Sequence, residues 1–181
     1  GLAVARSVIT AWPGYAVTPL RRLDGLARAA GVAAIDYKDE AGRFGLGSFK
    51  ALGGAYAVVQ LLRGEVARIA GGPRPGVADI LDGHHRDIVS GITVCCATDG
   101  NHGRSVAWGA RTFGCRCVIF IHATVSEGRK QAIERFGAEV RRCTGNYDDS
   151  VREAQETATR EGWFVVSYTS YPGYSEIPKL V

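Results

Sequence analysis

Apolar positions recur with two periods along the chain, and each period predicts one type of element. Short apolar runs of strand length stand at residues 32–37, 92–97, 117–122, 139–143 and 164–167. Apolar residues at helical spacing stand at residues 23–30, 51–66, 77–85, 104–113, 126–136 and 147–161. Segments rich in turn-forming residues predict loops at residues 44–50, 71–76 and 98–103.

Strands and helices alternate in the second half of the chain at the spacing of βαβ units. This pattern predicts an α/β fold of three layers, in which helices cover both faces of a mostly parallel open sheet. Ligands of such sheets bind outside the carboxyl ends of the strands. The loops at residues 44–50 and 98–103 both lie at such ends, so we expect the functional site there.

The composition narrows the class of protein without changing this fold. Hydrophobic residues make up 46% of the 181 residues and charged residues 22%, which is typical of a globular domain with a buried core. The net charge of +4 is scattered along the chain, so a nucleic-acid-binding surface is not expected. No apolar stretch approaches the roughly 20 residues of a membrane helix, so no membrane partner is expected either.

The cysteines indicate a reducing compartment. An odd number of cysteines, together with an N-terminus that lacks a signal-peptide pattern, argues against a disulfide framework. Cys115 and Cys117 are separated by one residue within an apolar run, which is not the spacing of zinc ligands and fits small buried side chains in a strand. We therefore expect buried thiols, no metal site and a cytoplasmic location. The cysteines are Cys95, Cys96, Cys115, Cys117 and Cys143.

Lys50 is the first candidate for chemistry, because it stands at the predicted start of a helix after a glycine-rich loop. The positive end of a helix dipole disfavours an ammonium ion, which helps a lysine amine to form an imine with an aldehyde. Lysines at solvated helix starts are also common. Taken alone, residues 48–50 leave both interpretations open.

The second candidate is the segment TDGNHG at residues 98–103, which connects a predicted strand to a predicted helix. Backbone N–H groups at such a helix start can point at a carboxylate or phosphate, and glycines allow close approach. The alternative is a simple turn in which Asp99 or Asn101 caps the helix. The spacing of Gly100 and Gly103 fits neither a P-loop nor a dinucleotide fingerprint.

Together the two segments resemble a known family. Residues 44–57 (FGLGSFKALGGAYA) resemble the cofactor-lysine segment of diaminopropionate ammonia-lyases, and residues 97–108 (ATDGNHGRSVAW) resemble the second signature of that family. The resemblance covers nearly the whole chain. Shorter matches follow the same order at residues 13–15, 18–20, 38–40, 137–139, 146–149 and 173–174.

The resemblance implies a fold-type II enzyme that uses pyridoxal 5'-phosphate. Lys50 is implied to form the Schiff base, Phe49 to pack near the cofactor ring and Asn101 to hydrogen-bond the ring hydroxyl oxygen. Asp99 is implied to be the general base at the α-carbon of the D-isomer. The implied reaction removes ammonia from 2,3-diaminopropionate and gives pyruvate and a second ammonia. The residues implied to hold the substrate carboxylate are Thr98, Asp99, Gly100, Asn101 and His102.

Tyr168 departs from the family pattern. It stands where the family has the aspartate that is implied to be the base for the L-isomer. A phenol is a poor base at neutral pH. We therefore expect a preference for the D-isomer.

The resemblance places the chain in the N-terminal half of the family. The sequence has no Met and no closing helix at residues 177–181, so we expect a truncated chain. The glycine-rich loop that grips the cofactor phosphate is implied to lie in the other half, so we expect weak cofactor binding. Residues 1–32 would pack on the missing larger domain, residues 33–168 would form the α/β domain with the cofactor lysine, and residues 169–181 would begin the second domain.

The expected partner is a small amino-acid substrate, and the full-length family implies a homodimer. Two alternatives stay open. One is a serine or threonine dehydratase, although the second signature of those enzymes typically has a small residue at the position of Asp99. The other is a non-catalytic remnant whose uncovered apolar face promotes self-association.

Overall fold

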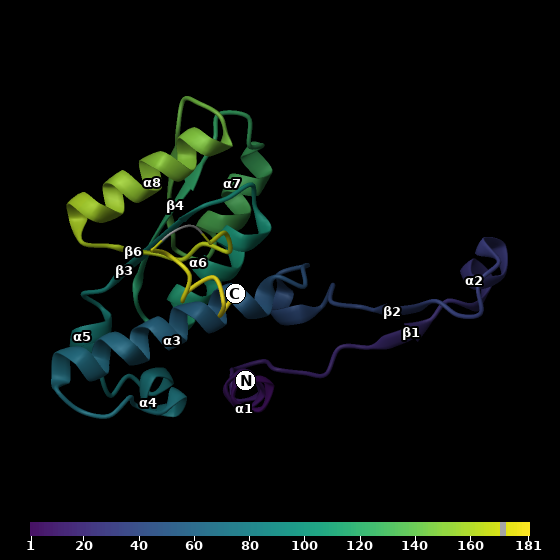
Figure 1. The fold of residues 1–181 in the computed structure, drawn as a ribbon, viewed down its shortest axis with the longest axis horizontal. Coiled ribbons are helices and arrows are strands. Elements are labelled where there is room, and N and C mark those ends of the chain that lie inside the picture. Colours follow the sequence, from purple (N-terminus) through teal and green to yellow (C-terminus); the bar gives the residue numbers. More distant parts are fainter. Residues whose placement is uncertain (171–172) are drawn as a thin grey trace.

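The structure, a computed structural model, describes residues 1–170 and 173–181, and within them a parallel sheet lies at the centre of the molecule (Figure 1). Its strands are β3 (Thr93–Ala97), β4 (Arg116–Ile121), β5 (Glu139–Arg142) and β6 (Phe164–Val165), in the order β5-β4-β3-β6. A separate antiparallel pair consists of β1 (Leu20–Arg22) and β2 (Asp36–Lys38). The α-helices are α1 (Leu2–Thr10), α2 (Asp24–Ala30), α3 (Ala51–Ala70), α4 (Val77–Leu81), α5 (Arg86–Val89), α6 (Asn101–Phe113), α7 (Glu127–Glu134) and α8 (Tyr147–Glu161).

Helices cover both faces of the parallel sheet. Helix α8 packs on β3, β4 and β6, whereas α6 packs on β3 and β4, and α7 packs on β5 from the other side (Figure 1). This burial on both faces explains why β3 and β4 are continuous apolar runs rather than alternating ones. The predicted three-layer α/β fold is therefore confirmed.

Small residues let α3 pack closely on α6. A Cβ atom added at Gly109 would lie 2.9 Å from the Cα atom of Ala55, and one added at Gly54 would lie 2.6 Å from Oγ of Ser105. The buried Ser105 hydroxyl donates a hydrogen bond to the carbonyl of Ala51 (2.9 Å). This contact fixes the start of α3 against α6, and both helix starts contribute to the site described below.

An aromatic cluster anchors the loop that precedes α3. The rings of Phe44 and Trp108 stack with centroids 4.5 Å apart, and the buried Trp12 lies 5.7 Å from both Trp108 and Phe113. Phe44 has a positive φ of 49°, an uncommon conformation for a residue other than glycine. The stacking therefore holds this turn, the 3-10 segment Arg43–Gly45, next to α6.

Residues 19–38 form an arm that projects from the body of the protein (Figure 1). It contains β1, α2 and β2, and apolar side chains such as Leu20, Leu26 and Tyr37 are exposed on it. At its base the buried Arg43 donates hydrogen bonds to Glu40 (2.8 Å) and to the Thr18 hydroxyl (2.9 Å). Arg43 also lowers the pKa of Glu40.

Several sequence predictions need correction. The strand expected at residues 32–37 is wrong for most of its length, because β2 begins only at Asp36 and pairs with β1 in the arm rather than with the central sheet. The single helix expected at residues 77–85 is two short helices, α4 and α5, with Gly83 (φ +77°) between them. Helix α6 begins at Asn101 rather than at residue 104. Helix α1 and strand β1 had not been predicted.

The cysteines are free thiols, as expected. All except Cys115 are buried, and burial raises the pKa of Cys95 to about 12. In the part of the chain that the structure describes, no cluster of three or more His, Cys, Asp or Glu side chains could hold a metal ion. Within the same residues, no helix is long and apolar enough to span a membrane.

Candidate active site

The candidate site lies where the order of the strands reverses. The chain runs from β3 to β4 and β5 in one direction and then returns to β6 on the other side of β3. Such a reversal opens a crevice at the carboxyl ends of the strands. The loop after β3 and the loop after β6 flank this crevice, and a cavity of about 460 Å³ lies there.

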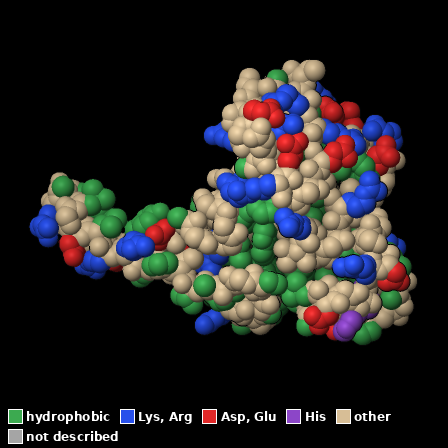
Figure 2. Space-filling model, turned by 180° about the vertical axis from the view of Figure 1, so that it is seen from behind, with side chains coloured by type: hydrophobic (Ala, Val, Ile, Leu, Met, Phe, Trp, Pro, Cys, Tyr) green, Lys and Arg blue, Asp and Glu red, His purple; other side chains and the backbone are tan. Residues whose placement is uncertain are grey.

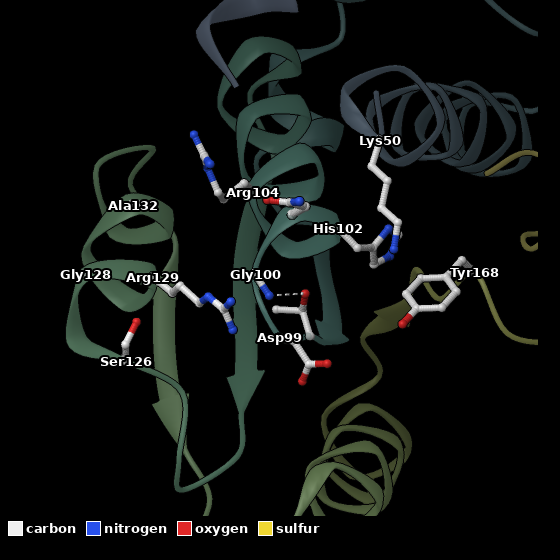
Figure 3. A pocket seen from close by; sticks show the side chains of 12 residues that line it. Lys50, Asp99, Gly100, His102, Arg104, Ser126, Gly128, Arg129, Ala132 and Tyr168 are labelled. Carbon is white, nitrogen blue, oxygen red and sulfur yellow. Dashed lines mark hydrogen bonds between the residues drawn. The ribbon is translucent and has the colours of Figure 1, made fainter. Parts of the chain in front are cut away.

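Lys50 reaches this cavity from the residue before α3. Its backbone N–H donates to the hydroxyl of the buried Ser48 (3.2 Å), which shapes the turn. Its ammonium nitrogen Nζ lies 4.5 Å from the centre of the Tyr168 ring, within the range of a cation–π contact. Figure 3 shows the side chain extended between His102 and Tyr168.

The loop after β3 is held by the buried Thr98. Its hydroxyl oxygen accepts hydrogen bonds from the backbone N–H groups of Gly100 (3.0 Å) and Gly103 (3.1 Å). Thr98 thus satisfies amide donors at the start of α6, so the capping role considered for Asp99 and Asn101 falls to Thr98 instead. Gly100 has φ 153° and ψ −76°, a conformation open essentially to glycine alone.

His102 forms a buried wall of the cavity and is neutral. Its side chain is 2% exposed, and its Nε2 atom lies 2.7 Å from the carbonyl oxygen of Val166, so Nε2 carries the proton and donates. Burial, with a smaller contribution from the nearby Lys50 charge, lowers the pKa of His102 to about 4. Among the described residues, the Nδ1 atom has no hydrogen-bond partner, which leaves a buried acceptor at the cavity wall.

Asp99 pairs with a histidine on the neighbouring strand end. Its Oδ1 atom lies 2.9 Å from Nε2 of His122, and Nδ1 of His122 lies 3.0 Å from the hydroxyl of Thr124. The Asp99 side chain is 61% exposed and that of His122 is 20% exposed. The carboxylate therefore borders the cavity while one of its oxygens is engaged.

Tyr168 covers the cavity from the β6 side. Its ring meets the His102 ring edge-on, with centroids 4.9 Å apart. Its hydroxyl lies 3.3 Å from the hydroxyl of Tyr147 at the start of α8. Burial, followed by the hydrogen bond with Tyr168, raises the pKa of Tyr147, so the Tyr147 phenol is neutral near pH 7.

Positive charge gathers on the opposite wall. Arg104 of α6 and Arg129 of α7 both line the cavity, and Figure 3 shows the Arg129 side chain extending toward Asp99 and Gly100. Arg129 lies against Gly100, since a Cβ atom at Gly100 would be 3.7 Å from its Cδ atom. Burial lowers the pKa of Arg104, but its guanidinium stays charged.

The structure brings most of the sequence-predicted residues together. The members that line the cavity are Lys50, Thr98, Asp99, Gly100, Asn101 and His102. Phe49 is 72% exposed and does not contribute to the described cavity wall. Its implied contact with a cofactor ring stays a prediction.

Sequence reasoning missed His122, Thr124 and Arg129. His122 comes directly after β4, as the loop of Asp99 comes after β3, and this position was the one available signal. It could not be used without knowing that β3 and β4 are neighbours.

Comparisons with known proteins agree with this geometry. Residues 11–177 match the model of the family described as pyridoxal-phosphate dependent enzymes. The diaminopropionate ammonia-lyase of Escherichia coli K12 is 41% identical over 169 residues, which cover 93% of this chain and 41% of that protein. The chain thus spans less than half of that relative.

Two further comparisons bear on the site. The crystal structure of the Escherichia coli diaminopropionate ammonia-lyase with an aminoacrylate-PLP azomethine reaction intermediate superposes with a TM-score of 0.82 at 39% identity, covering 98% of this chain and 43% of that one. A chloroplastic biosynthetic threonine dehydratase of Arabidopsis thaliana is 34% identical over 79 residues, 44% of this chain and 13% of that protein.

Proposed function

Because the chain belongs to the family of pyridoxal-phosphate dependent enzymes, we propose that it carries the catalytic residues of an ammonia-lyase that acts on 2,3-diaminopropionate. The observation that carries this proposal is that Lys50 and Asp99 converge on one cavity, with the start of α6 between them. The overall reaction consumes one water and gives pyruvate and two molecules of ammonia. The likeness to a diaminopropionate ammonia-lyase supports this choice of substrate.

The residues present fit the cofactor. Lys50 supplies an amine for its aldehyde at the mouth of a cavity of about 460 Å³, a size typical of small-ligand sites. The unpartnered Nδ1 of His102 offers a buried acceptor, and Asn101 offers an amide at the start of α6. When bound, pyridoxal phosphate withdraws electrons from the α-carbon of the attached amino acid.

The protein's own groups then divide the work. Asp99 accepts the α-proton, because it is the carboxylate that lines the cavity. Lys50 returns the proton in later steps. The Arg129 guanidinium and the start of α6 hold the substrate carboxylate, since both present positive charge to the cavity. Tyr168 excludes water from the β6 side.

The position of Tyr168 supports a preference for the D-isomer. Tyr168 brings a phenol to its side of the cavity, with its hydroxyl 3.3 Å from that of Tyr147, and phenols accept a proton poorly at neutral pH. Asp99, on the loop after β3, is the carboxylate that lines the same cavity (Figure 3). The α-proton that faces Asp99 is therefore the one that is removed.

A dehydratase that acts on serine or threonine is the second candidate. The partial likeness to a threonine dehydratase favours it. Asp99 favours the lyase, as does the segment at residues 146–149. Product analysis with serine, threonine and 2,3-diaminopropionate separates the two reactions.

The free cysteines are consistent with a reducing compartment, which supports a cytoplasmic location.

The test of the proposed function is the covalent attachment of the cofactor. We expect one equivalent of pyridoxal phosphate, reduced with borohydride, to label the peptide that contains Lys50. Lys130→Ala, at a half-buried lysine of α7 that pairs with Glu127 and Glu134, should label normally, whereas Lys50→Ala should not. Labelling spread evenly over the lysines, or pyruvate release from neither isomer of 2,3-diaminopropionate by the loaded protein, would contradict the proposal.

A further inference from the structure

The pairing of Asp99 with His122 follows from the register of two neighbouring strands. Strands β3 and β4 are parallel, and Ala97 pairs with Phe120. The pattern continues one step beyond the strands, where the backbone N–H of Thr98 donates to the carbonyl of Phe120 (3.0 Å). Continued one further step, the same register places Asp99 opposite His122. The contact is therefore set by the sheet and not by a chance meeting of surface loops.

The backbone that carries His122 is fixed in place. The guanidinium of Arg142, from β5, donates to the carbonyl oxygens of Ala123 (3.1 Å) and Val125 (2.6 Å). The N–H of Ala123 donates to the carbonyl of Gly145 (3.1 Å). The turn after β4 is thus tied to the turn after β5, and the imidazole is a pre-positioned partner for Asp99.

The tautomer of His122 follows from its two contacts. An ionised carboxylate can only accept a hydrogen bond, so Nε2 of His122 must donate to Oδ1 of Asp99. In the neutral ring Nδ1 is then an acceptor, and the hydroxyl of Thr124 is the group that can donate to it. Thr124 therefore selects the tautomer that binds Asp99.

We propose that His122 is a positioning residue for Asp99: its Nε2–H holds Oδ1, and this leaves Oδ2 directed at the cavity as the proton-accepting atom. This inference rests on the proposed role of Asp99 as the base. A 61% exposed aspartate would otherwise exchange rotamers freely, and misplacing a reacting group by about 1 Å can lower a rate on the order of a hundredfold.

The first test needs no cofactor. The chain has four histidines, whose ring signals appear in long-range 1H–15N NMR spectra. The signals of His122 are assigned as those that disappear in His122→Gln. We expect a single tautomer with the proton on Nε2 in the wild type, and a mixture of both tautomers in Thr124→Val, which keeps the shape of the side chain but not its hydroxyl. Both tautomers in the wild type would overturn the proposal.

The second test follows the rotamer of Asp99 through its three-bond couplings. We expect one χ1 rotamer in the wild type and in His122→Gln, whose amide can still donate, and averaging in His122→Leu. The exposed His84→Gln is the matched control and should leave Asp99 unchanged. A single rotamer that survives in His122→Leu contradicts the positioning role.

Kinetics of the cofactor-loaded protein complete the design. We expect His122→Leu to lower kcat for D-2,3-diaminopropionate at least tenfold while KM changes less than twofold, and His122→Gln to restore most of kcat. Equal rates in the three proteins overturn the proposal. If the wild type releases no pyruvate, the proposed function fails, and the NMR results alone decide whether His122 positions Asp99.

Discussion

Tyr168 contacts three side chains at the candidate site. Its ring lies against the Lys50 ammonium and the His102 imidazole, and its hydroxyl lies near that of Tyr147. Tyr168 thus lines the β6 side of the cavity that Lys50 and Asp99 also line (Figure 3). A carboxylate at this position would bring a second base to the site.

We therefore expect Tyr168→Asp to gain activity toward L-2,3-diaminopropionate. The wild type should turn over the D-isomer at least tenfold faster than the L-isomer, and the variant should narrow this ratio. Pyruvate release from each pure enantiomer measures both rates. Tyr168→Phe is the control, because it keeps the ring and should keep the preference for the D-isomer. Equal wild-type rates for the two isomers would be inconsistent with Asp99 as the main base.

The neutral His102 makes stability depend on pH. The unfolded chain binds a proton near the ordinary pKa of 6.5, whereas the folded protein resists protonation until about pH 4. Since the unfolded state then holds more protons, the free energy of unfolding falls as pH decreases from 6.5 to 4, by about 3 kcal/mol in total.

Two measurements check this prediction. Urea unfolding at pH 7, 5.5 and 4.5 should show the decline, and NMR should show the His102 ring neutral down to about pH 4.5. A ring that protonates near pH 6.5 in the folded protein would contradict the buried, neutral state.

At the scale of elements, the close contact between α3 and α6 is the most demanding packing feature. In Gly109→Ala the new methyl group would lie 2.9 Å from the Cα atom of Ala55, which is backbone and cannot move aside easily. We expect the overpacking cost of about 1–3 kcal/mol to exceed the gain in helix propensity of about 1 kcal/mol. Thermal unfolding should show a lower Tm.

Gly64→Ala provides the matched control in α3. The nearest atom to the new methyl group would be Nη2 of Arg74 at 3.6 Å, an ordinary contact at the end of a flexible side chain. Here the propensity gain of up to about 1 kcal/mol should dominate, and Tm should rise. Equal effects of the two substitutions would show that the contact between α3 and α6 is not tight.

The sequence predicted the elements that are buried on a regular apolar face and missed those that depend on distant partners. Strands β3 and β4 are continuous buried runs, so their positions could be inferred locally. Strand β2 could not, because its partner β1 has an exposed burial pattern that carries no hydrophobic period. The early start of α6 depends on the Thr98 hydroxyl, which no periodicity reveals.

The same distinction applies to the site. Lys50 and the loop at residues 98–102 could be predicted, because each stands next to glycines at the end of an element. His122 and Tyr147 could not be predicted. The contact of His122 depends on which strands are neighbours, and that of Tyr147 depends on the start of α8 lying close to Tyr168 after β6. Local patterns therefore predicted residues that line the cavity, and the fold was needed to find their neighbours.

At the scale of the whole molecule, the arm and the body differ in how they are held. The arm is a two-stranded ribbon with one short helix, and its apolar side chains are exposed on one face of the molecule (Figure 2). An isolated ribbon of this kind is marginally stable in water. Strands β3 and β4 of the central sheet, by contrast, are buried between layers of helices.

We therefore expect amide hydrogen exchange in residues 20–38 to be far faster than in β3 and β4. Exchange followed by mass spectrometry on dilute protein measures both regions in one experiment. Repeating it at high concentration tests self-association, because a homodimer that covers the arm would slow exchange there. Protection in the arm equal to that of β3 at every concentration would contradict marginal stability.

The register between β3 and β4 also bears on how the pairing of Asp99 with His122 can be sought in other sequences. The two residues are 23 positions apart here, and α6, its flanking turns and β4 fill that interval. An insertion in the turn before β4 would change the count but leave the strand ends opposite each other. In divergent relatives, the equivalent pair should therefore be sought by the position of each residue after the end of its strand, and not by the number of residues between the two.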